Sequence, residues 1–270
     1  MCSVEEIQAA IRRPFWFQLY MLRDREFVLA LLERARAAGC ETLAFTVDLA
    51  VSGIRLRDFR NGMLGGGRLG RLSRALQLAT RPRWLYDVGL RGRPHSLGNL
   101  SGKVADVGDL DAYKGFVDSQ FDPTVTWQDI AWLRAHWPGR ILIKGVMEAE
   151  DARAAADVGA DGVIVSNHGG RQLDGVAASI AKLPAVAEAV GDRLEVYVDG
   201  GVRSGIDVVK ALALGARGVL IGRPWIWAVA ARGERGVRNL LSVFQREIAT
   251  AMALMGVTRV EQITSESIER

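Results

Sequence analysis

Short apolar segments of strand length recur along the chain, and each is followed by a stretch in which apolar residues return every three or four positions. A glycine or a charged residue marks most of the junctions. This alternation is typical of βαβ units and predicts a parallel sheet with helices between its strands. The predicted strands are 15–20, 42–47, 141–144, 162–165, 194–198 and 218–221, and the predicted helices are 4–11, 25–38, 127–136, 149–158, 180–190, 205–214, 225–231 and 237–255.

Polar residues follow many of these strands, not just one or two of them. In an open, doubly wound sheet, functional groups concentrate at one switch point, whereas in a TIM (β/α)8 barrel they gather at the C-terminal ends of many strands. We therefore predict an α/β TIM barrel, of which this chain supplies six of the eight βα units, the first two being absent from the sequence. The polar residues are Gln18, Tyr20, Thr46, Asp48, Lys144, His168, Asp199 and Arg223.

One segment, residues 51–123, interrupts the alternation and is longer than an ordinary βα loop. We expect residues 1–270 to form a single domain with this segment as an insertion. Within it, residues 68–93 interleave arginines with Leu and Trp, a pattern that predicts peripheral contact with an anionic membrane surface. A solvated helical insertion that packs against the barrel mouth or a neighbouring subunit explains the same pattern equally well.

The composition narrows the class of protein. With 49% hydrophobic and 24% charged residues, the chain is globular, and its net charge of +4 is too small to indicate nucleic-acid binding. Cys2 and Cys40 form no Cys/His cluster, which indicates neither a disulfide framework nor a metal site and favours the reducing cytoplasm. No apolar run reaches the roughly 18 residues of a spanning helix. We expect a cytoplasmic protein, with peripheral attachment to the inner face of the cytoplasmic membrane as the alternative location.

The run from Val163 to Gly175 carries the clearest chemistry, because His168 and Arg171 follow directly on a buried strand. An imidazole takes up a proton near neutral pH, a guanidinium binds a carboxylate through two parallel hydrogen bonds, and the adjacent glycines let a flat ligand approach closely. A helix-capping turn with an incidental histidine is the alternative. We expect Asp48 to orient His168.

Three further groups complete the predicted site. Arg55 is expected to join Arg171 on a substrate carboxylate, and Tyr20 to hydrogen-bond the substrate oxygen. Lys144 ends an apolar strand, where a partly buried lysine needs an anionic partner: either a neighbouring carboxylate or a cofactor ring that gains negative charge on reduction. Glycines and an arginine after the last two strands predict a phosphate cradle made of Asp199, Gly200, Gly201, Arg203, Gly222 and Arg223.

Together these residues resemble the FMN-dependent α-hydroxy-acid oxidoreductases, a family that includes lactate dehydrogenases, glycolate oxidases and mandelate dehydrogenases. The Ser-Asn-His-Gly-Gly-Arg-Gln-Leu-Asp string at 166–174 is the most specific match, and residues 84–99 look most like bacterial respiratory L-lactate dehydrogenases. The resemblance implies FMN across the mouth of a TIM barrel, with His168 as the base and with Tyr20, Arg55 and Arg171 on the substrate. The FMN contacts it implies are Gln18, Thr46, Lys144, Ser166, Asp199, Gly200, Gly201, Arg203, Gly222 and Arg223.

The implied reaction is oxidation of an L-2-hydroxy acid, most closely L-lactate, to the 2-oxo acid. The electrons would pass from the flavin to a respiratory acceptor such as a quinone, or to a cytochrome or oxygen, and the resemblance also implies a homo-tetramer. A mandelate- or glycolate-type oxidase and a non-catalytic truncated fragment are the alternatives. A flavin barrel of the isopentenyl diphosphate isomerase or inosine monophosphate dehydrogenase type is disfavoured, because such enzymes do not need His168 and Arg171 with Arg55 to hold a carboxylate.

Overall fold

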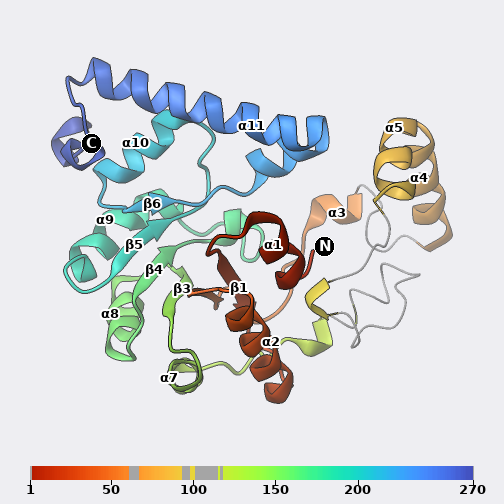
Figure 1. Ribbon diagram of the computed structural model, residues 1–270, viewed down its shortest axis with the longest axis horizontal. Coiled ribbons are helices and arrows are strands. Elements are labelled where there is room, and N and C mark those ends of the chain that lie inside the picture. The colour runs from red at the N-terminus through yellow and green to blue at the C-terminus, as the bar shows by residue number, and fades with distance from the viewer. Residues whose placement is uncertain (1, 61–66, 93–97, 101–114, 116–117, 270) are drawn as a thin grey trace. The chain divides into compact units, whose positions relative to one another are not determined.

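The computed structural model describes residues 2–60, 67–92, 98–100, 115 and 118–269 (Figure 1). These residues divide into two compact units. The first unit comprises Met1–Glu41 and Ala50–Thr124, and the second comprises Thr42–Leu49 and Val125–Arg270. The predicted insertion, residues 51–123, therefore falls in the first unit.

The second unit contains parallel strands that pair in chain order: β2 (Thr42–Thr46), β3 (Arg140–Val146), β4 (Gly162–Val165), β5 (Glu195–Val198) and β6 (Gly218–Val219). The connecting helices are α7 (Trp127–His136), α8 (Ala149–Asp157), α9 (Ser179–Val190) and α10 (Gly205–Ala213), and they lie along the outer side of the curled sheet (Figure 1). Parallel strands with helices outside are the βα units of the predicted barrel, so the predicted fold class is confirmed for the part of the barrel that the chain supplies.

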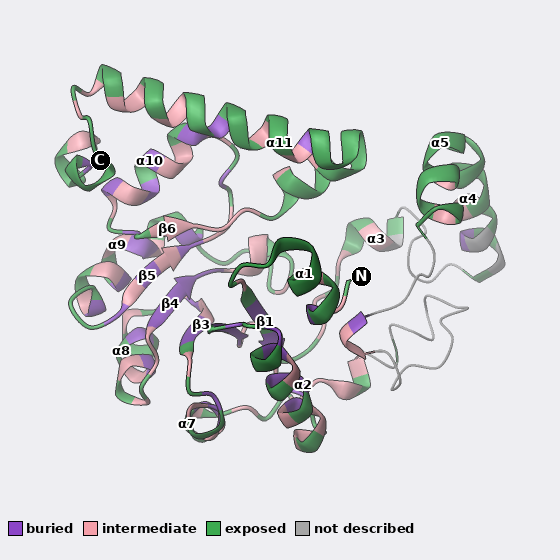
Figure 2. Cartoon of the chain, viewed as in Figure 1, coloured by how far each residue is buried: buried purple, intermediate pink, exposed green. Residues whose placement is uncertain are grey.

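In the second unit, β2 and β4 are buried throughout, β3 and β5 are buried at some of their residues, and β6 is of intermediate exposure (Figure 2). On one face of the sheet, Ala44, Leu142 and Ile164 form a buried cluster, against which Tyr197 and Leu220 pack. Side chains two positions further along a strand return to the same face, one pleat nearer its C-terminal end. The strand pattern thus places a polar layer directly beyond the apolar one, and this layer consists of Thr46, Lys144, Ser166 and Asp199.

The observed strand boundaries differ from the predicted ones by two residues or fewer. Strand β6 pairs over Gly218–Val219 only, since Leu220 makes a single further bond, from its N–H to the carbonyl of Val198. The two predicted C-terminal helices lie on either side of a kink in α11 (Arg223–Leu254), where Arg232 and Gly233 have non-helical dihedral angles. The predicted break is therefore present, and Gly233, at φ 56°, allows it without interrupting the element.

The first unit contains α1 (Val4–Ile11), β1 (Trp16–Tyr20) and α2 (Arg25–Ala37). The two helices are joined by an ion pair in which the Arg34 guanidinium donates to both carboxylate oxygens of Glu5, at 2.7 and 3.0 Å. Arg34 also donates to the carbonyl of Asn99, and the Asn99 side chain accepts from the N–H of Val4. Residues 98–100 are therefore fixed against both helices.

The described part of the insertion contains α3 (Leu56–Arg60), α4 (Gly67–Ala79), α5 (Pro82–Trp84) and a π-helical turn at Leu85–Leu90. On α4, the leucines at positions 69, 72 and 76 are spaced so that they share one helix face, and they are 80%, 58% and 61% exposed. Of the basic stretch at 68–93, residue 93 and the side chains of Arg68 and Arg71 lie outside the described residues. None of the described helices is long and apolar enough to cross a membrane.

Candidate functional site

His168 and Asp48 form the pair that the sequence predicts, at the C-terminal edge of the second unit's sheet. His168 Nδ1 lies 2.9 Å from Asp48 Oδ1, and both side chains are largely buried, at 16% and 13% exposure. An ionised carboxylate only accepts hydrogen bonds, so the hydrogen of the neutral ring lies on Nδ1. The lone pair is then on Nε2, which has no partner among the described residues and is free to accept a proton.

The turn that carries His168 has a backbone that side chains rarely adopt. His168 has φ 55°, in the left-handed region, and Gly169 and Gly170 follow at 66° and 70°. Two side chains brace this turn: the Ser166 hydroxyl accepts from the N–H of His168, at 3.0 Å, and the Asn167 side chain accepts from the N–H of Gly170, at 3.3 Å. Strain of this kind persists only where surrounding contacts hold it, and it is common at active sites.

Lys144 stands at the centre of the polar layer. Its Nζ donates to Ser166 Oγ, at 2.8 Å, and pairs with Asp199 Oδ2, at 2.9 Å, while Asp48 Oδ2 is 4.0 Å away. An ammonium group has three hydrogens, so one remains without a hydrogen-bond acceptor among the described residues. Both alternatives from the sequence therefore retain support: the lysine has neighbouring carboxylates, and it keeps a donor for a ligand.

The glycine-rich segments after β5 and β6 differ in what they offer an anion. At the start of α10, the Asp207 carboxylate accepts from the N–H groups of Arg203 and Ser204, and the Glu247 carboxylate accepts from the N–H of Gly205. The α11 N-terminus has no side-chain cap, and the Arg223 side chain there donates to the carbonyl of Gly169, at 3.1 Å. The helix N-terminus that is open to a phosphate is therefore that of α11.

The remaining predicted residues are placed as follows. In the second unit, Thr46 is buried, whereas Arg171, Arg203 and Gly222 are exposed. In the first unit, Gln18 is exposed on β1, and Tyr20 is half-buried with its ring edge-on to Phe121 at 5.3 Å. Arg55 is half-buried there, and its Nε is enclosed without a hydrogen-bond partner among the described residues.

Sequence reasoning gave no role to three residues that shape the site. Gly145 lies at φ 109°, where the pairing of β3 with β4 shifts register. Ser179 is buried and donates to the carbonyl of Asp199, and Asn167 donates to the carbonyl of Ala177. A glycine within an apolar strand is a recognised sign of a bulge, so Gly145 had a signal in the sequence. Asn167 had a signal only as a member of the string at 166–174, and Ser179 had none, because its partner is a backbone carbonyl 20 positions away.

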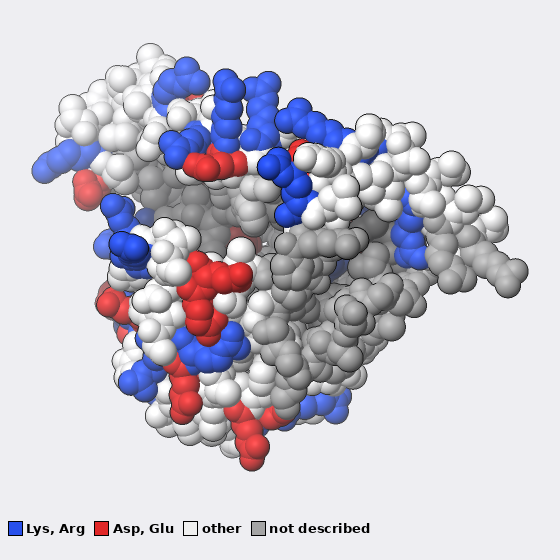
Figure 3. Space-filling view, turned by 45° about the vertical axis from the view of Figure 1, so that its right-hand side comes forward, with Lys and Arg blue, Asp and Glu red and all other residues white. Residues whose placement is uncertain are grey.

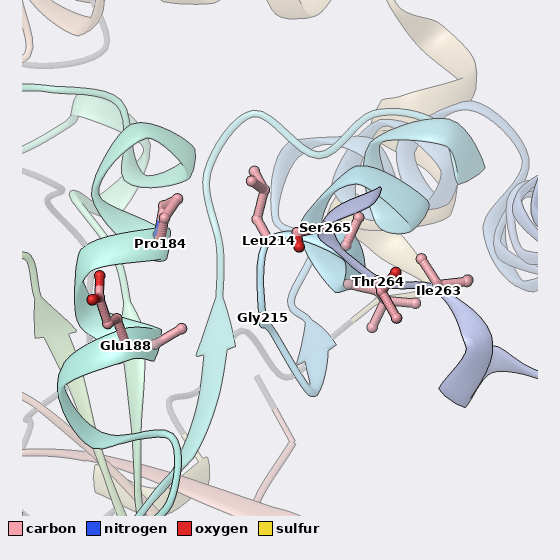
Figure 4. A pocket seen from close by; sticks show the side chains of 10 residues that line it. Pro184, Glu188, Leu214, Gly215, Ile263, Thr264 and Ser265 are labelled. Carbon is pink, nitrogen blue, oxygen red and sulfur yellow. The ribbon is translucent and has the colours of Figure 1, made fainter. Parts of the chain in front are cut away.

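A separate groove lies on the helical side of the second unit (Figure 4). It has a volume of about 460 Å³ and is bounded by α9, the end of α10 and residues 263–265. Its walls are largely apolar, with Glu188 as the one carboxylate among the lining residues. None of the predicted catalytic or binding groups lines it, so the groove is not the site predicted from the sequence.

Comparison with known proteins gives one consistent result. The family described as FMN-dependent dehydrogenase matches residues 1–270. The chain is 54% identical to an L-lactate dehydrogenase of Caulobacter vibrioides and 50% identical to one of Pseudomonas putida, covering all of this chain and 71% and 70% of those proteins. Among solved structures, it is similar to a mandelate oxidase, with 41% identity and a TM-score of 0.75 over 96% of this chain and 65% of that one. It is also similar to a monotopic membrane (S)-mandelate dehydrogenase, with 34% identity and a TM-score of 0.86 over 99% and 70%.

Proposed function

Because the chain belongs to the FMN-dependent dehydrogenase family, as the resemblance in its sequence predicted, we propose that its site oxidises an L-2-hydroxy acid, most closely L-lactate, to the 2-oxo acid. The family and these relatives are FMN-dependent 2-hydroxy-acid oxidoreductases. The observation that carries the proposal is the His168–Asp48 pair, at 2.9 Å, on the same sheet edge as the lysine and the glycine-rich turns. The choice of L-lactate rests on the relatives from Caulobacter vibrioides and Pseudomonas putida, which are L-lactate dehydrogenases.

The residues of the second unit fit FMN. The uncapped α11 N-terminus at Gly222–Arg223 suits a phosphate. Gly201, which follows the neighbouring strand at φ 80°, has no atom within 4 Å of where a Cβ would lie and leaves room for a close approach. Lys144 retains a donor for the polar edge of the ring. When bound, FMN supplies the chemistry that no side chain has, the acceptance of two electrons from the substrate.

The role proposed for His168 is to take one proton from the substrate through Nε2. The Asp48 carboxylate at Nδ1 fixes the ring orientation and stabilises the imidazolium that results. The charges around the ring also favour protonation of His168. With a neutral ring, Asp48, Asp199 and Lys144 sum to −1, and the imidazolium brings the sum to zero, so protonation removes a net charge from a largely buried group.

The substrate carboxylate is assigned to Arg55 and Arg171, and the substrate hydroxyl oxygen to Tyr20. Arg55 supports the assignment because its enclosed Nε has no hydrogen-bond partner among the described residues, a cost that an anion would relieve. A guanidinium also matches the planar geometry of a carboxylate.

The proposed electron acceptor is a respiratory quinone, reached at the inner face of the cytoplasmic membrane. One structural relative is a monotopic membrane protein, and the exposed leucine face of α4 together with the basic composition of residues 68–93 suits an anionic lipid surface.

The direct test is flavin reduction. The purified chain is loaded with FMN, and the flavin absorbance is followed anaerobically after L-lactate or L-mandelate is added. Bleaching by L-lactate is expected, and a His168→Gln variant should bind FMN but bleach at least about a hundredfold more slowly. Bound FMN without bleaching by any L-2-hydroxy acid would leave the chain as a non-catalytic flavin-binding fragment, and no bound FMN would reject the cofactor site.

A further inference from the structure

The hydroxyl of Ser166 lies between the two groups that the proposed chemistry most needs. It accepts one hydrogen bond from Lys144 Nζ, at 2.8 Å, and a second from the N–H of His168, at 3.0 Å. A hydroxyl oxygen has two lone pairs, so both are engaged. Ser166 is also completely buried, with 0% exposure.

We propose that Ser166 is a positioning residue, which keeps Lys144 paired with Asp199 and away from Asp48, so that the full charge of Asp48 acts on His168. The inference rests on the proposed function, because it explains what sets the proton affinity of His168, the proposed base.

Lys144 lies between two carboxylates, those of Asp199 and Asp48. Its Nζ is 2.9 Å from Asp199 Oδ2 and 4.0 Å from Asp48 Oδ2. The Asp48 oxygen is enclosed and has no hydrogen-bond partner among the described residues. It is therefore, like Asp199 Oδ1, an open acceptor for an ammonium group that loses one of its bonds. The bond to Ser166, together with the ion pair to Asp199, opposes a move of about 1 Å towards Asp48, a distance over which a largely buried ion pair strengthens markedly.

A move of Lys144 would act on His168 through Asp48. If the lysine neutralises Asp48 more strongly, less of the carboxylate's charge stabilises the imidazolium, and the ring gives up its proton at lower pH. The charged groups that face the histidine turn in the second unit are Asp48, Lys144, Asp199 and Arg223. Asp48 and Arg223 have bonds that do not involve Ser166, so Lys144 is the group that the hydroxyl controls.

The test compares Ser166→Ala with Ser166→Thr, which keeps the hydroxyl, in the FMN-loaded protein. Anaerobic reduction by L-lactate is measured from pH 5 to 9. We expect Ser166→Ala to bind FMN within about threefold of the unchanged protein, to react about tenfold more slowly, and to move the acid limb of its rate profile about one unit lower. Ser166→Thr should restore the position of that limb. Asp199→Asn, which releases Lys144 from its other partner, should move the limb in the same direction.

A second readout needs neither cofactor nor turnover. The His168 ring signals are followed by NMR against pH, and in Ser166→Ala they should titrate at lower pH than in the unchanged chain. A matched control is Thr42→Val. It removes a buried hydroxyl at the N-terminal end of β2, at the end of the strand away from the polar layer, and should alter stability alone. The inference would be overturned if Ser166→Ala reacted more slowly while the acid limb of its rate profile and the titration of its His168 ring both stayed in place. Absence of flavin reduction in the unchanged protein would instead reject the proposed function, and the ring titration would still test Ser166.

Discussion

Gly145 lies against Asp48 so closely that a Cβ at position 145 would be 2.7 Å from the Cβ of Asp48 and 2.9 Å from its backbone nitrogen. The glycine also lies at φ 109°, in a conformation that other residues rarely adopt. This contact joins the bulge of β3, which carries Lys144, to the loop that carries the partner of His168. Because Gly145 has no side chain, Asp48 can occupy the position from which it pairs with His168.

The first prediction follows from that contact. Gly145→Ala should strain the backbone and displace Asp48, lowering the rate of flavin reduction by L-lactate at least tenfold and destabilising the chain by about 1–3 kcal/mol. Stopped-flow absorbance and urea unfolding measure the two effects. The control is Gly39→Ala, which has a similar φ of 79° and no atom within 4 Å of the added Cβ, and which should lose stability without losing rate. Equal rate losses in both variants would show that the effect is not specific to Asp48.

Asp48→Asn tests the charge of the carboxylate separately from its shape. The amide is nearly isosteric, but it can present its NH₂ group to Nδ1, which would favour the wrong ring tautomer and remove the charge that stabilises the imidazolium. We expect flavin reduction to slow by about 10²–10⁴-fold while FMN remains bound. Rapid-mixing kinetics under anaerobic conditions measure this step. A loss of less than about threefold would mean that Asp48 is structural.

The sequence alone predicted the barrel class because the period of the apolar residues changes between strand and helix along the chain. It also predicted that Asp48 and His168 meet, although they are 120 positions apart, because both follow strands whose C-terminal ends share one edge of a parallel sheet. Side-chain alternation then explains why Lys144 and Ser166 line the same layer.

What could not be predicted depends on backbone detail. The sequence treats Arg203 and the α10 N-terminus as a phosphate cradle, yet Asp207 and Glu247 occupy several of the N–H groups there. Glu247 lies in the C-terminal part of α11, and no local sequence pattern predicts that it accepts a hydrogen bond from the N–H of Gly205. Similarly, the complete burial of Ser166 is a property of packing that its residue type does not predict.

The reactivity of the two cysteines should differ sharply. Burial raises the pKa of the Cys40 thiol to about 11, whereas Cys2 is exposed. Since the thiolate is the reactive form, Cys40 is essentially unreactive at pH 8 in the folded chain. Iodoacetamide should therefore add one label to the native protein, at Cys2, and two after unfolding in urea. Intact-mass spectrometry counts the labels, and rapid double labelling of the native chain would contradict the burial of Cys40.

Membrane attachment predicts a role for the exposed leucine face of α4. Replacing Leu69, Leu72 and Leu76 with Gln should abolish co-sedimentation with phosphatidylglycerol vesicles and leave flavin reduction by L-lactate unchanged. Leu254→Gln is a matched control, because Leu254 is 85% exposed but lies at the end of α11. Neutralising Arg68, Arg71 and Arg74 should weaken binding and its salt dependence. Undiminished binding by both sets of variants would remove α4 as the contact.

The ion pair between Glu5 and Arg34 predicts a pH-dependent contribution to stability. The hydrogen bonds from Arg34 lower the pKa of Glu5 to about 2, from about 4.3 in an unfolded chain. A lowered pKa means that the folded state holds the proton less tightly, so the contribution is complete above about pH 5 and is lost as the pH falls towards 2. Both side chains are partly exposed, at 51% and 33%, so solvent screening limits the effect to about 1 kcal/mol or less. Glu5→Gln should therefore lower the urea midpoint at pH 7 and differ progressively less from the unchanged chain as the pH falls towards 2. Glu33→Gln, at an exposed position next to Arg34 on α2, should show no such convergence, and a Glu5→Gln difference that persists at low pH would assign the loss to packing instead of charge.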